Sequence, residues 1–167
     1  MPLTERGNAG LMVQRPLKLG TAPVVAVRLV REAQVPYDGR PVIEPRQAAS
    51  IASGFMADLD REHFVVLTLD VKMKLIGINV ASVGTTEATL VHGREVFKAA
   101  ILQNASRIIV CHNHPSGDPT PSQEDFAATR DLCYAGRVLG IPVLDHIIVA
   151  PNGAFASVRE TNPGLFG

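Results

Sequence analysis

The chain has 167 residues, of which 46% are hydrophobic, so it is long enough to form one domain with a substantial core. Its 16 basic and 16 acidic residues cancel, so the chain has no net charge to attract nucleic acid or an anionic membrane. Binding to either would require a local basic patch. Two cysteines, Cys111 and Cys133, are too few for a disulfide framework and are expected to be free. With no signal peptide or membrane span predicted, we expect a cytoplasmic protein.

The chain is expected to divide into an N-terminal extension, residues 1–41, and a main domain, residues 42–167. Residues 1–22 mix glycine, proline and charge without periodicity, so we expect the extension to be partly flexible. The valine-rich residues 24–30 predict a strand that adds to the edge of a sheet.

The main domain begins with a predicted helix and a predicted buried strand. Apolar residues recur at helical spacing over residues 46–59, and the run at residues 64–69 is almost continuously apolar. This strand opens at Glu62 or His63, which places the carboxylate of Glu62 at the mouth of a core strand.

A strand over residues 75–83 and a helix over about 93–104 follow. Residues 107–111 are apolar and β-branched and predict another buried strand, with His112 and His114 at its end. Since side chains two positions apart on a strand share a face, the two imidazoles are expected to point the same way.

A proline-rich loop joins this strand to a helix predicted over residues 122–139. Three prolines and one glycine within residues 115–121 favour a tight reversal that brings the strand end close to the helix start. Ser122 and Asp125 match a Ser-x-x-Asp helix cap, which by itself explains this pair but not the histidines. The carboxylate of Asp125 can favour the helix N-terminus and still bind a metal.

The three groups together have the chemistry of a metal site. Two imidazole nitrogens from His112 and His114 and one oxygen from Asp125 suit a tetrahedral Zn²⁺ whose fourth position is open. Such a site also needs a general base. Three glutamates are candidates for this base: Glu62 at the strand end, Glu95 in a predicted helix, and Glu124. On its helix Glu124 points about 100° away from Asp125.

Two further strands are predicted near residues 143–150 and 154–158, joined by a Pro-Asn-Gly turn. The irregular order of strands and helices predicts an α/β or α+β fold with a mixed central sheet. For Asp145 and His146 we favour a structural hydrogen-bonded pair over the orientation of a zinc ligand. Arg94 lies near a positive helix end, which suggests that it meets a substrate or an acidic neighbour.

These motifs resemble the JAMM zinc metalloproteases of the JAB/MPN/Mov34 superfamily. The signature is His112-x-His114, seven residues, and Ser122-x-x-Asp125, with a glutamate upstream. The chain is most similar to the bacterial RadC branch, over about residues 42–158. The similar stretches include Arg61-Glu62-His63-Phe64, Gly84-Thr85, Arg94-Glu95-Val96-Phe97, Gln103-Asn104-Ala105 and Leu144-Asp145-His146-Ile147-Ile148-Val149.

The resemblance implies a JAB/MPN-like mixed central β-sheet flanked by helices and a zinc-dependent hydrolase that cleaves a peptide or isopeptide bond. It implies His112, His114 and Asp125 as zinc ligands, Glu62 as general base and Ser122 as a stabiliser of the oxyanion. In that mechanism a water activated by the metal and by the base attacks the carbonyl carbon.

The chain departs from the RadC pattern at Val83, where arginine is usual, and at Gly93, where proline is usual. Residues 1–41 are also too short for the helix-hairpin-helix module of full-length RadC proteins. Two alternatives stay open: a DNA-repair-associated protein that binds or processes nucleic acid, and a non-catalytic interaction domain. The contiguous letters His-Asn-His do not indicate an HNH nuclease, which spreads those residues over a ββα unit.

Overall fold

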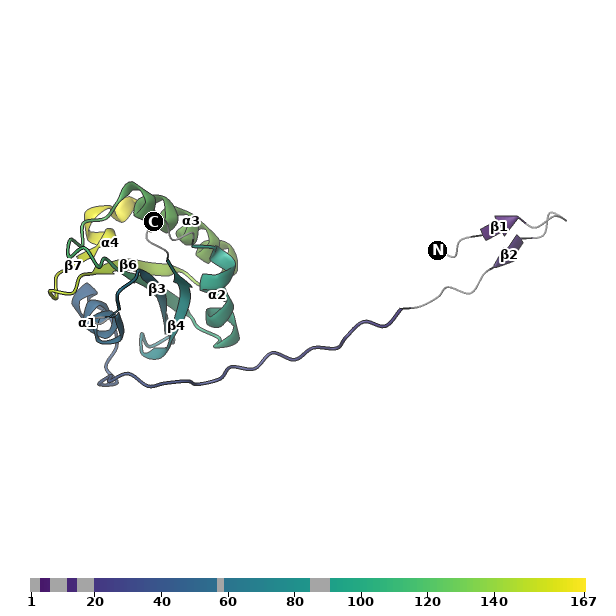
Figure 1. Ribbon diagram of the computed structural model, residues 1–167, viewed down its shortest axis with the longest axis horizontal. Coiled ribbons are helices and arrows are strands. Elements are labelled where there is room, and N and C mark those ends of the chain that lie inside the picture. The colour runs from purple at the N-terminus through teal and green to yellow at the C-terminus, as the bar shows by residue number, and fades with distance from the viewer. Residues whose placement is uncertain (1–3, 7–11, 15–19, 57–58, 85–90) are drawn as a thin grey trace.

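A five-stranded sheet with strand order β4-β3-β5-β6-β7 is the centre of the described structure (Figure 1). The computed structural model describes residues 4–6, 12–14, 20–56, 59–84 and 91–167. The helices are α1 (Pro45–Met56), α2 (Gly93–Leu102), α3 (Gln123–Leu139), α4 (Val158–Thr161) and the 3-10 helix η1 (Pro163–Leu165). The strands are β1 (Thr4–Arg6), β2 (Met12–Gln14), β3 (His63–Leu69), β4 (Leu75–Val83), β5 (Arg107–Asn113), β6 (Val143–Val149) and β7 (Phe155–Ser157).

The sheet mixes parallel and antiparallel pairs. Strand β3 is antiparallel to both β4 and β5, β5 is parallel to β6, and β7 is antiparallel to β6. Because parallel neighbours need a crossover connection, α3 carries the chain from the end of β5 back to the start of β6. This arrangement confirms the predicted α+β fold with a mixed central sheet flanked by helices. Strands β1 and β2 form a separate antiparallel pair.

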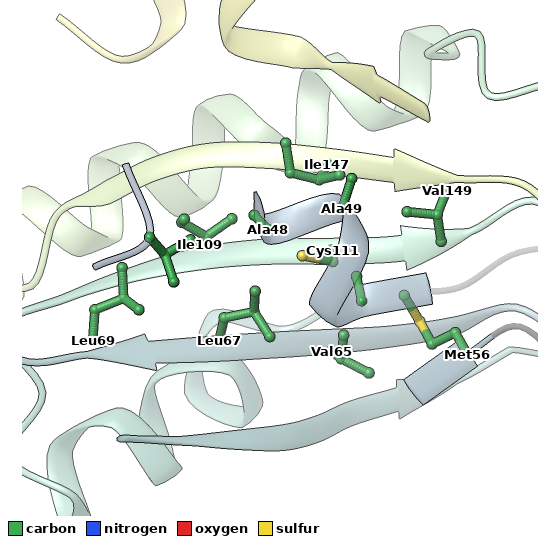
Figure 2. Close-up of a cluster of buried hydrophobic side chains, with 12 residues drawn as sticks. Ala48, Ala49, Met56, Val65, Leu67, Leu69, Ile109, Cys111, Ile147 and Val149 are labelled. Atoms are coloured by element: carbon green, nitrogen blue, oxygen red, sulfur yellow. The ribbon is translucent and has the colours of Figure 1, made fainter. Parts of the chain in front are cut away.

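Helix α1 covers one face of the sheet, and α2 and α3 cover the other (Figure 1). Figure 2 shows the cluster under α1, in which Ala48 and Met56 of the helix meet Val65 and Leu67 of β3. Phe64 and Val66 of β3 contribute to the second cluster, under α2 and α3. The strand is therefore buried on both faces, which explains its continuous apolar run.

Most predicted elements are confirmed within a few residues, and the predicted strand over residues 75–83 coincides with β4. Strand β5 continues to Asn113, because its ladder with β3 includes His112 opposite Phe64 and its ladder with β6 includes Asn113 opposite Val149. Two short elements, α4 and η1, were not predicted, since one or two turns of helix carry too little periodicity to detect. None of the described helices is long and apolar enough to cross a membrane.

The predicted strand over residues 24–30 is wrong. Residues 20–38 have no regular secondary structure and extend away from the sheet (Figure 1), and Val25 and Val30 are 78% and 79% exposed. Valine content favours a strand only where a neighbouring strand supplies hydrogen bonds and packing, and the described residues supply neither here. Most of residues 1–19, residues 57–58 of the predicted helix over 46–59, and Thr85 lie outside the described residues.

Candidate metal centre

The end of β5 and the start of α3 meet at one place beside the sheet. His112 belongs to β5, His114 follows that strand directly, and Asp125 lies in the first turn of α3. One ligand atom from each side chain lies within 4.8 Å of the other two. The fold thus brings together the three side chains that the sequence predicts as metal ligands.

The two imidazoles turn their Nε2 atoms toward each other and toward the carboxylate. His112 Nε2 lies 2.9 Å from His114 Nε2 and 3.2 Å from Asp125 Oδ1. His114 Nε2 lies 3.8 Å from Asp125 Oδ2. The side chain of His112 is 7% exposed and those of His114 and Asp125 are each 16% exposed, so the group is shielded but still reachable from solvent.

The proline-rich loop fixes the orientation of His114. Its Nδ1 lies 2.7 Å from the carbonyl oxygen of Asp118. Because a carbonyl only accepts hydrogen bonds, this nitrogen carries a proton, and in the neutral imidazole Nε2 then keeps its lone pair. Asp118 is held in turn by Thr120, whose backbone N–H and hydroxyl both donate to Asp118 Oδ1. The loop therefore directs a lone pair of His114 into the group.

A capping box orients Asp125. The backbone N–H and the hydroxyl of Ser122 each donate to Asp125 Oδ2 at 2.7 Å, and Asp125 N–H donates to Ser122 Oγ at 3.1 Å. These bonds satisfy the start of α3 and leave Oδ1 directed at His112. The same carboxylate thus takes part in the helix cap and in the group of possible metal ligands. The role of Ser122 as an oxyanion stabiliser stays a prediction.

His112 is the most deeply buried member of the group. The ring of Phe64 lies parallel to it, with centroids 6.0 Å apart and an interplanar angle of 9°. Burial lowers the pKa of His112 to about 4, and repulsion from His114 acts in the same direction, against the attraction of Asp125. At neutral pH the imidazole is therefore uncharged, which is the form that binds metals.

The residues fit a divalent transition metal. Neutral imidazole nitrogens and a carboxylate oxygen are ligands that Zn²⁺ accepts, and three protein ligands with partial exposure match a site that keeps one position for water or substrate.

Asp145 and His146 form the hydrogen-bonded pair that the sequence predicts, because the backbone N–H of His146 donates to Asp145 Oδ1 at 2.7 Å, but their side chains lie on opposite faces of β6. His146 Nε2 lies 2.8 Å from His112 Nδ1, so this side chain contacts a predicted ligand directly. Asp145 points to the opposite face, where it accepts hydrogen bonds from the hydroxyl of Ser157 and the backbone N–H of Arg159. Burial raises the pKa of Asp145, and these hydrogen bonds oppose the shift.

The sequence predicts the pair with Asp145 but does not predict that the His146 side chain contacts His112. A sequence signal was available, because His146 follows Asp145 within a strand, β6, whose other residues are apolar and mostly buried. Such a side chain needs a polar partner inside the protein. Only the pairing of β5 with β6 identifies that partner as His112.

Glu62 lies immediately before β3 and is partly buried. The antiparallel ladder of β3 with β5 ends at the pair Phe64 and His112, so Glu62 lies just beyond the ladder, at the end of the sheet where His114 follows β5. The buried side chain of Asn113 holds this segment on both sides: its Oδ1 accepts from His63 N–H at 2.7 Å, and its Nδ2 donates to the carbonyl of Arg61 at 2.9 Å.

The competing glutamates lie in different settings. Glu95 of α2 forms an ion pair with Lys98 at 2.5 Å on the surface, and Glu124 of α3 is exposed. Arg94 has a side chain that is 81% exposed and lies 3.9 Å from Glu95, so the acidic neighbour that we expected is present. Cys111 points to the α1 side of the sheet, away from the metal group, as expected for its place on the strand.

Comparison with known proteins identifies the family. A family model described as "RadC-like JAB domain" matches residues 42–163. A "UPF0758 protein" of Moorella thermoacetica is 50% identical over 118 residues, which are 71% of this chain and 51% of the relative. A "UPF0758 protein" of Caldanaerobacter subterraneus subsp. tengcongensis is 43% identical over 151 residues, or 90% of this chain and 64% of the relative.

The chain belongs to the RadC-like JAB domain family, since the family model covers most of its length. This confirms the resemblance drawn from the JAMM signature. The chain spans between 51% and 64% of the length of these two relatives, and their names state no activity.

The contacts of Asn113 predict a measurable contribution to stability. Asn113→Ala removes the acceptor of His63 N–H and the donor to Arg61, and an unpaired buried polar group costs about 1–3 kcal/mol. We expect urea unfolding to show a loss in that range. The control Asn152→Ala truncates an exposed amide in a turn and should cost less. Equal losses in the two variants would contradict the role of Asn113 as a clamp.

The capping box predicts a second effect on stability. Ser122→Ala removes the acceptor for Asp125 N–H and should lower the free energy of unfolding by about 1 kcal/mol in metal-free protein. Ser122→Thr keeps a capping hydroxyl and should recover most of that loss. Ser116→Ala, at an exposed loop position, is the control and should change stability by less than about 0.5 kcal/mol. A Ser122→Ala variant as stable as the Ser116→Ala variant would argue against the cap.

Proposed function

We propose that this chain is a zinc-dependent hydrolase of the JAMM type that cleaves a peptide or isopeptide bond with a water molecule. The observation that carries the proposal is the convergence of His112, His114 and Asp125 within 4.8 Å at a partly exposed edge of the fold. Membership of the RadC-like JAB domain family supports the same reaction class.

His112, His114 and Asp125 would hold the ion. When bound, Zn²⁺ supplies a Lewis acid that brings the pKa of a water ligand to roughly 7. The neutral imidazoles contribute nitrogen lone pairs, and the carboxylate of Asp125 offsets part of the cationic charge. The loop contact of His114 and the capping box of Asp125 hold these donors in place before any ion arrives.

Glu62 is proposed as the general base that takes a proton from the attacking water and delivers it to the leaving amine. Its support is its place just beyond the pair of Phe64 with His112, its partial burial and the clamp by Asn113. A second contact steadies the same segment, because Gly84 N–H donates to the carbonyl of Glu62 at 2.8 Å.

The hydroxyl of Ser122 is proposed to donate a hydrogen bond to the substrate oxygen as negative charge develops there. Its hydroxyl lies 2.7 Å from Asp125 Oδ2, so it is next to a proposed metal ligand. To act on substrate, the hydroxyl must turn from Asp125, while the Ser122 backbone N–H keeps its own bond to that carboxylate.

We also propose a cytoplasmic location. Both cysteines are free and buried in the structure, which suits a reducing compartment. Burial raises the pKa of Cys133 to about 11 and that of Cys111 further, so neither thiol is reactive at neutral pH.

The zinc site predicts that the purified full chain binds one Zn²⁺ per molecule in elemental analysis. His114→Ala and Asp125→Asn should each weaken zinc affinity at least about 100-fold, since even partners of the ligands are worth 10- to 100-fold. His92→Ala removes an exposed histidine elsewhere and should leave affinity unchanged. Zinc binding that survives the loss of His114 or Asp125 would contradict the assigned ligand set.

The assignment of Glu62 predicts a loss of activity without a loss of metal. Zinc-loaded chain is incubated with a library of linear peptides and lysine-branched isopeptides, and cleavage is measured by mass spectrometry. Glu62→Gln should keep the zinc and lower cleavage by about 100-fold or more. Glu95→Gln and Glu124→Gln are matched controls at the competing glutamates and should cleave as the unmodified chain does.

Three outcomes would count against this function. Full cleavage by Glu62→Gln would remove Glu62 as the base, and cleavage by His112→Ala would remove the metal mechanism. A chain that cleaves neither probe but binds duplex DNA in a strongly salt-dependent manner would favour the nucleic-acid alternative.

A further inference from the structure

A chain of hydrogen bonds runs behind His112, on the side away from solvent. His112 Nδ1 lies 2.8 Å from His146 Nε2, and His146 Nδ1 lies 2.7 Å from Thr129 Oγ1. The hydroxyl of Thr129 lies 2.6 Å from the backbone carbonyl of Asp125. His146 and Thr129 are both 0% exposed, so water does not compete for these bonds.

The carbonyl of Asp125 at one end fixes which atom donates and which accepts in each of these hydrogen bonds. The Asp125 carbonyl only accepts, so the single hydroxyl proton of Thr129 is donated to it. Thr129 Oγ1 must then accept from His146, which places the imidazole proton of His146 on Nδ1. The remaining nitrogen of His146, Nε2, carries a lone pair and accepts from His112 Nδ1–H.

The consequence reaches the predicted metal ligand. With the proton of His112 on Nδ1, its Nε2 has a lone pair that faces the lone pair of His114 Nε2 at 2.9 Å. Asp125 adds a carboxylate oxygen 3.2 Å from the same atom of His112. In these tautomers the two nitrogens and the carboxylate oxygen direct lone pairs to one place, which is an arrangement that a metal cation satisfies.

We propose that His146 and Thr129 are positioning residues that hold His112 in the Nδ1–H tautomer and so present its Nε2 lone pair to the metal. This inference rests on the proposed metal site, and it assigns a role to two residues outside the JAMM signature. Neither residue contacts the ion, the water or the substrate in this assignment.

Neighbouring groups hold the rings of His112 and His146 in fixed orientations. The ring of Phe64 stacks on His112 and meets the ring of His146 edge-on, with centroids 5.4 Å apart at 62°. The backbone of His146 is fixed by the parallel ladder, in which it pairs with Val110 of β5. Rotation of either ring would therefore require movement of a buried aromatic side chain.

The hydrogen-bond chain also connects ligands from two different elements. It begins at the carbonyl of Asp125 in α3 and ends at His112 in β5, passing through Thr129 one helical turn later and through His146 in β6. The side chain of Asp125 faces the other nitrogen of His112. We expect these linked contacts to fix the distance between His112 of β5 and Asp125 of α3.

The decisive comparison is between two substitutions at Thr129. Thr129→Val keeps the shape of the side chain but removes the hydroxyl, whereas Thr129→Ser keeps the hydroxyl and removes a methyl group. If Thr129 served packing alone, the serine variant would be the more damaging. If the hydroxyl sets the tautomers, the valine variant should be damaged and the serine variant should recover.

Affinity for Zn²⁺ and for Co²⁺ is measured on the full chain by competition with a chromophoric chelator. We expect Thr129→Val to weaken binding about 10- to 100-fold, and Thr129→Ser to remain within a few-fold of the unmodified chain. Thermal unfolding of the metal-free variants checks that each is folded. His146→Leu should weaken binding at least as much as Thr129→Val, and the threonine pair carries the test if His146→Leu does not fold.

Imidazole nitrogen NMR of the metal-free protein gives a second readout that packing would not change. In the unmodified chain, His112 and His146 should both show protonated Nδ1 and unprotonated Nε2. In Thr129→Val, a population with protonated Nε2 should appear for His146 and for His112.

The outcomes separate this inference from the proposed function. Equal metal affinity of the valine and serine variants, or an Nε2–H tautomer of His112 in the unmodified metal-free chain, would overturn the positioning role. Failure of the unmodified chain to bind Zn²⁺ or Co²⁺ would overturn the proposed function, while an Nδ1–H signal from His112 would still support the hydrogen-bond chain.

Discussion

The antiparallel pairing of β3 with β5 is the constraint on which the candidate site depends. It sets Phe64 directly across from His112, so that an aromatic ring covers the buried imidazole. The ladder ends at this pair, and the side chain of Asn113 holds the segment that carries Glu62 just beyond it. A single backbone register therefore positions a predicted ligand, its packing partner and the candidate base.

The start of α3 supplies the remaining ligand at little structural cost. A helix N-terminus favours a carboxylate both through its unpaired N–H groups and through the helix dipole. Asp125 meets these needs with one oxygen and turns the other toward His112. The cap and the metal ligand are therefore compatible functions of one side chain, and the proline-rich loop before Ser122 determines that this helix begins next to the end of β5.

Buried polar side chains lie on both faces of β6, and each has a hydrogen-bond partner that offsets the free-energy cost of its burial. Burial lowers the pKa of His146 well below its usual range and that of His112 to about 4, so both rings are neutral and need partners that suit neutral imidazole. Thr129 and His146 supply those partners on one face. Asp145, on the other face, is satisfied by Ser157 and Arg159 and contributes to the packing of the C-terminal segment.

The sequence by itself determined the elements and the ligand types, because those depend on local periodicity and spacing. The apolar runs predicted the strands, His112 and His114 share a strand face at a spacing of two, and the Ser-x-x-Asp pattern placed Asp125 in a first helical turn. Residues 24–30 show the limit of that reasoning, since they have strand composition and no strand partner among the described residues. Only the tertiary structure decided that His146 contacts His112, 34 residues away in sequence, and that Asn113 clamps a segment 50 residues away. These contacts follow from strand order and register, which are set by packing across the whole sheet, and so they leave no local pattern from which they could be inferred.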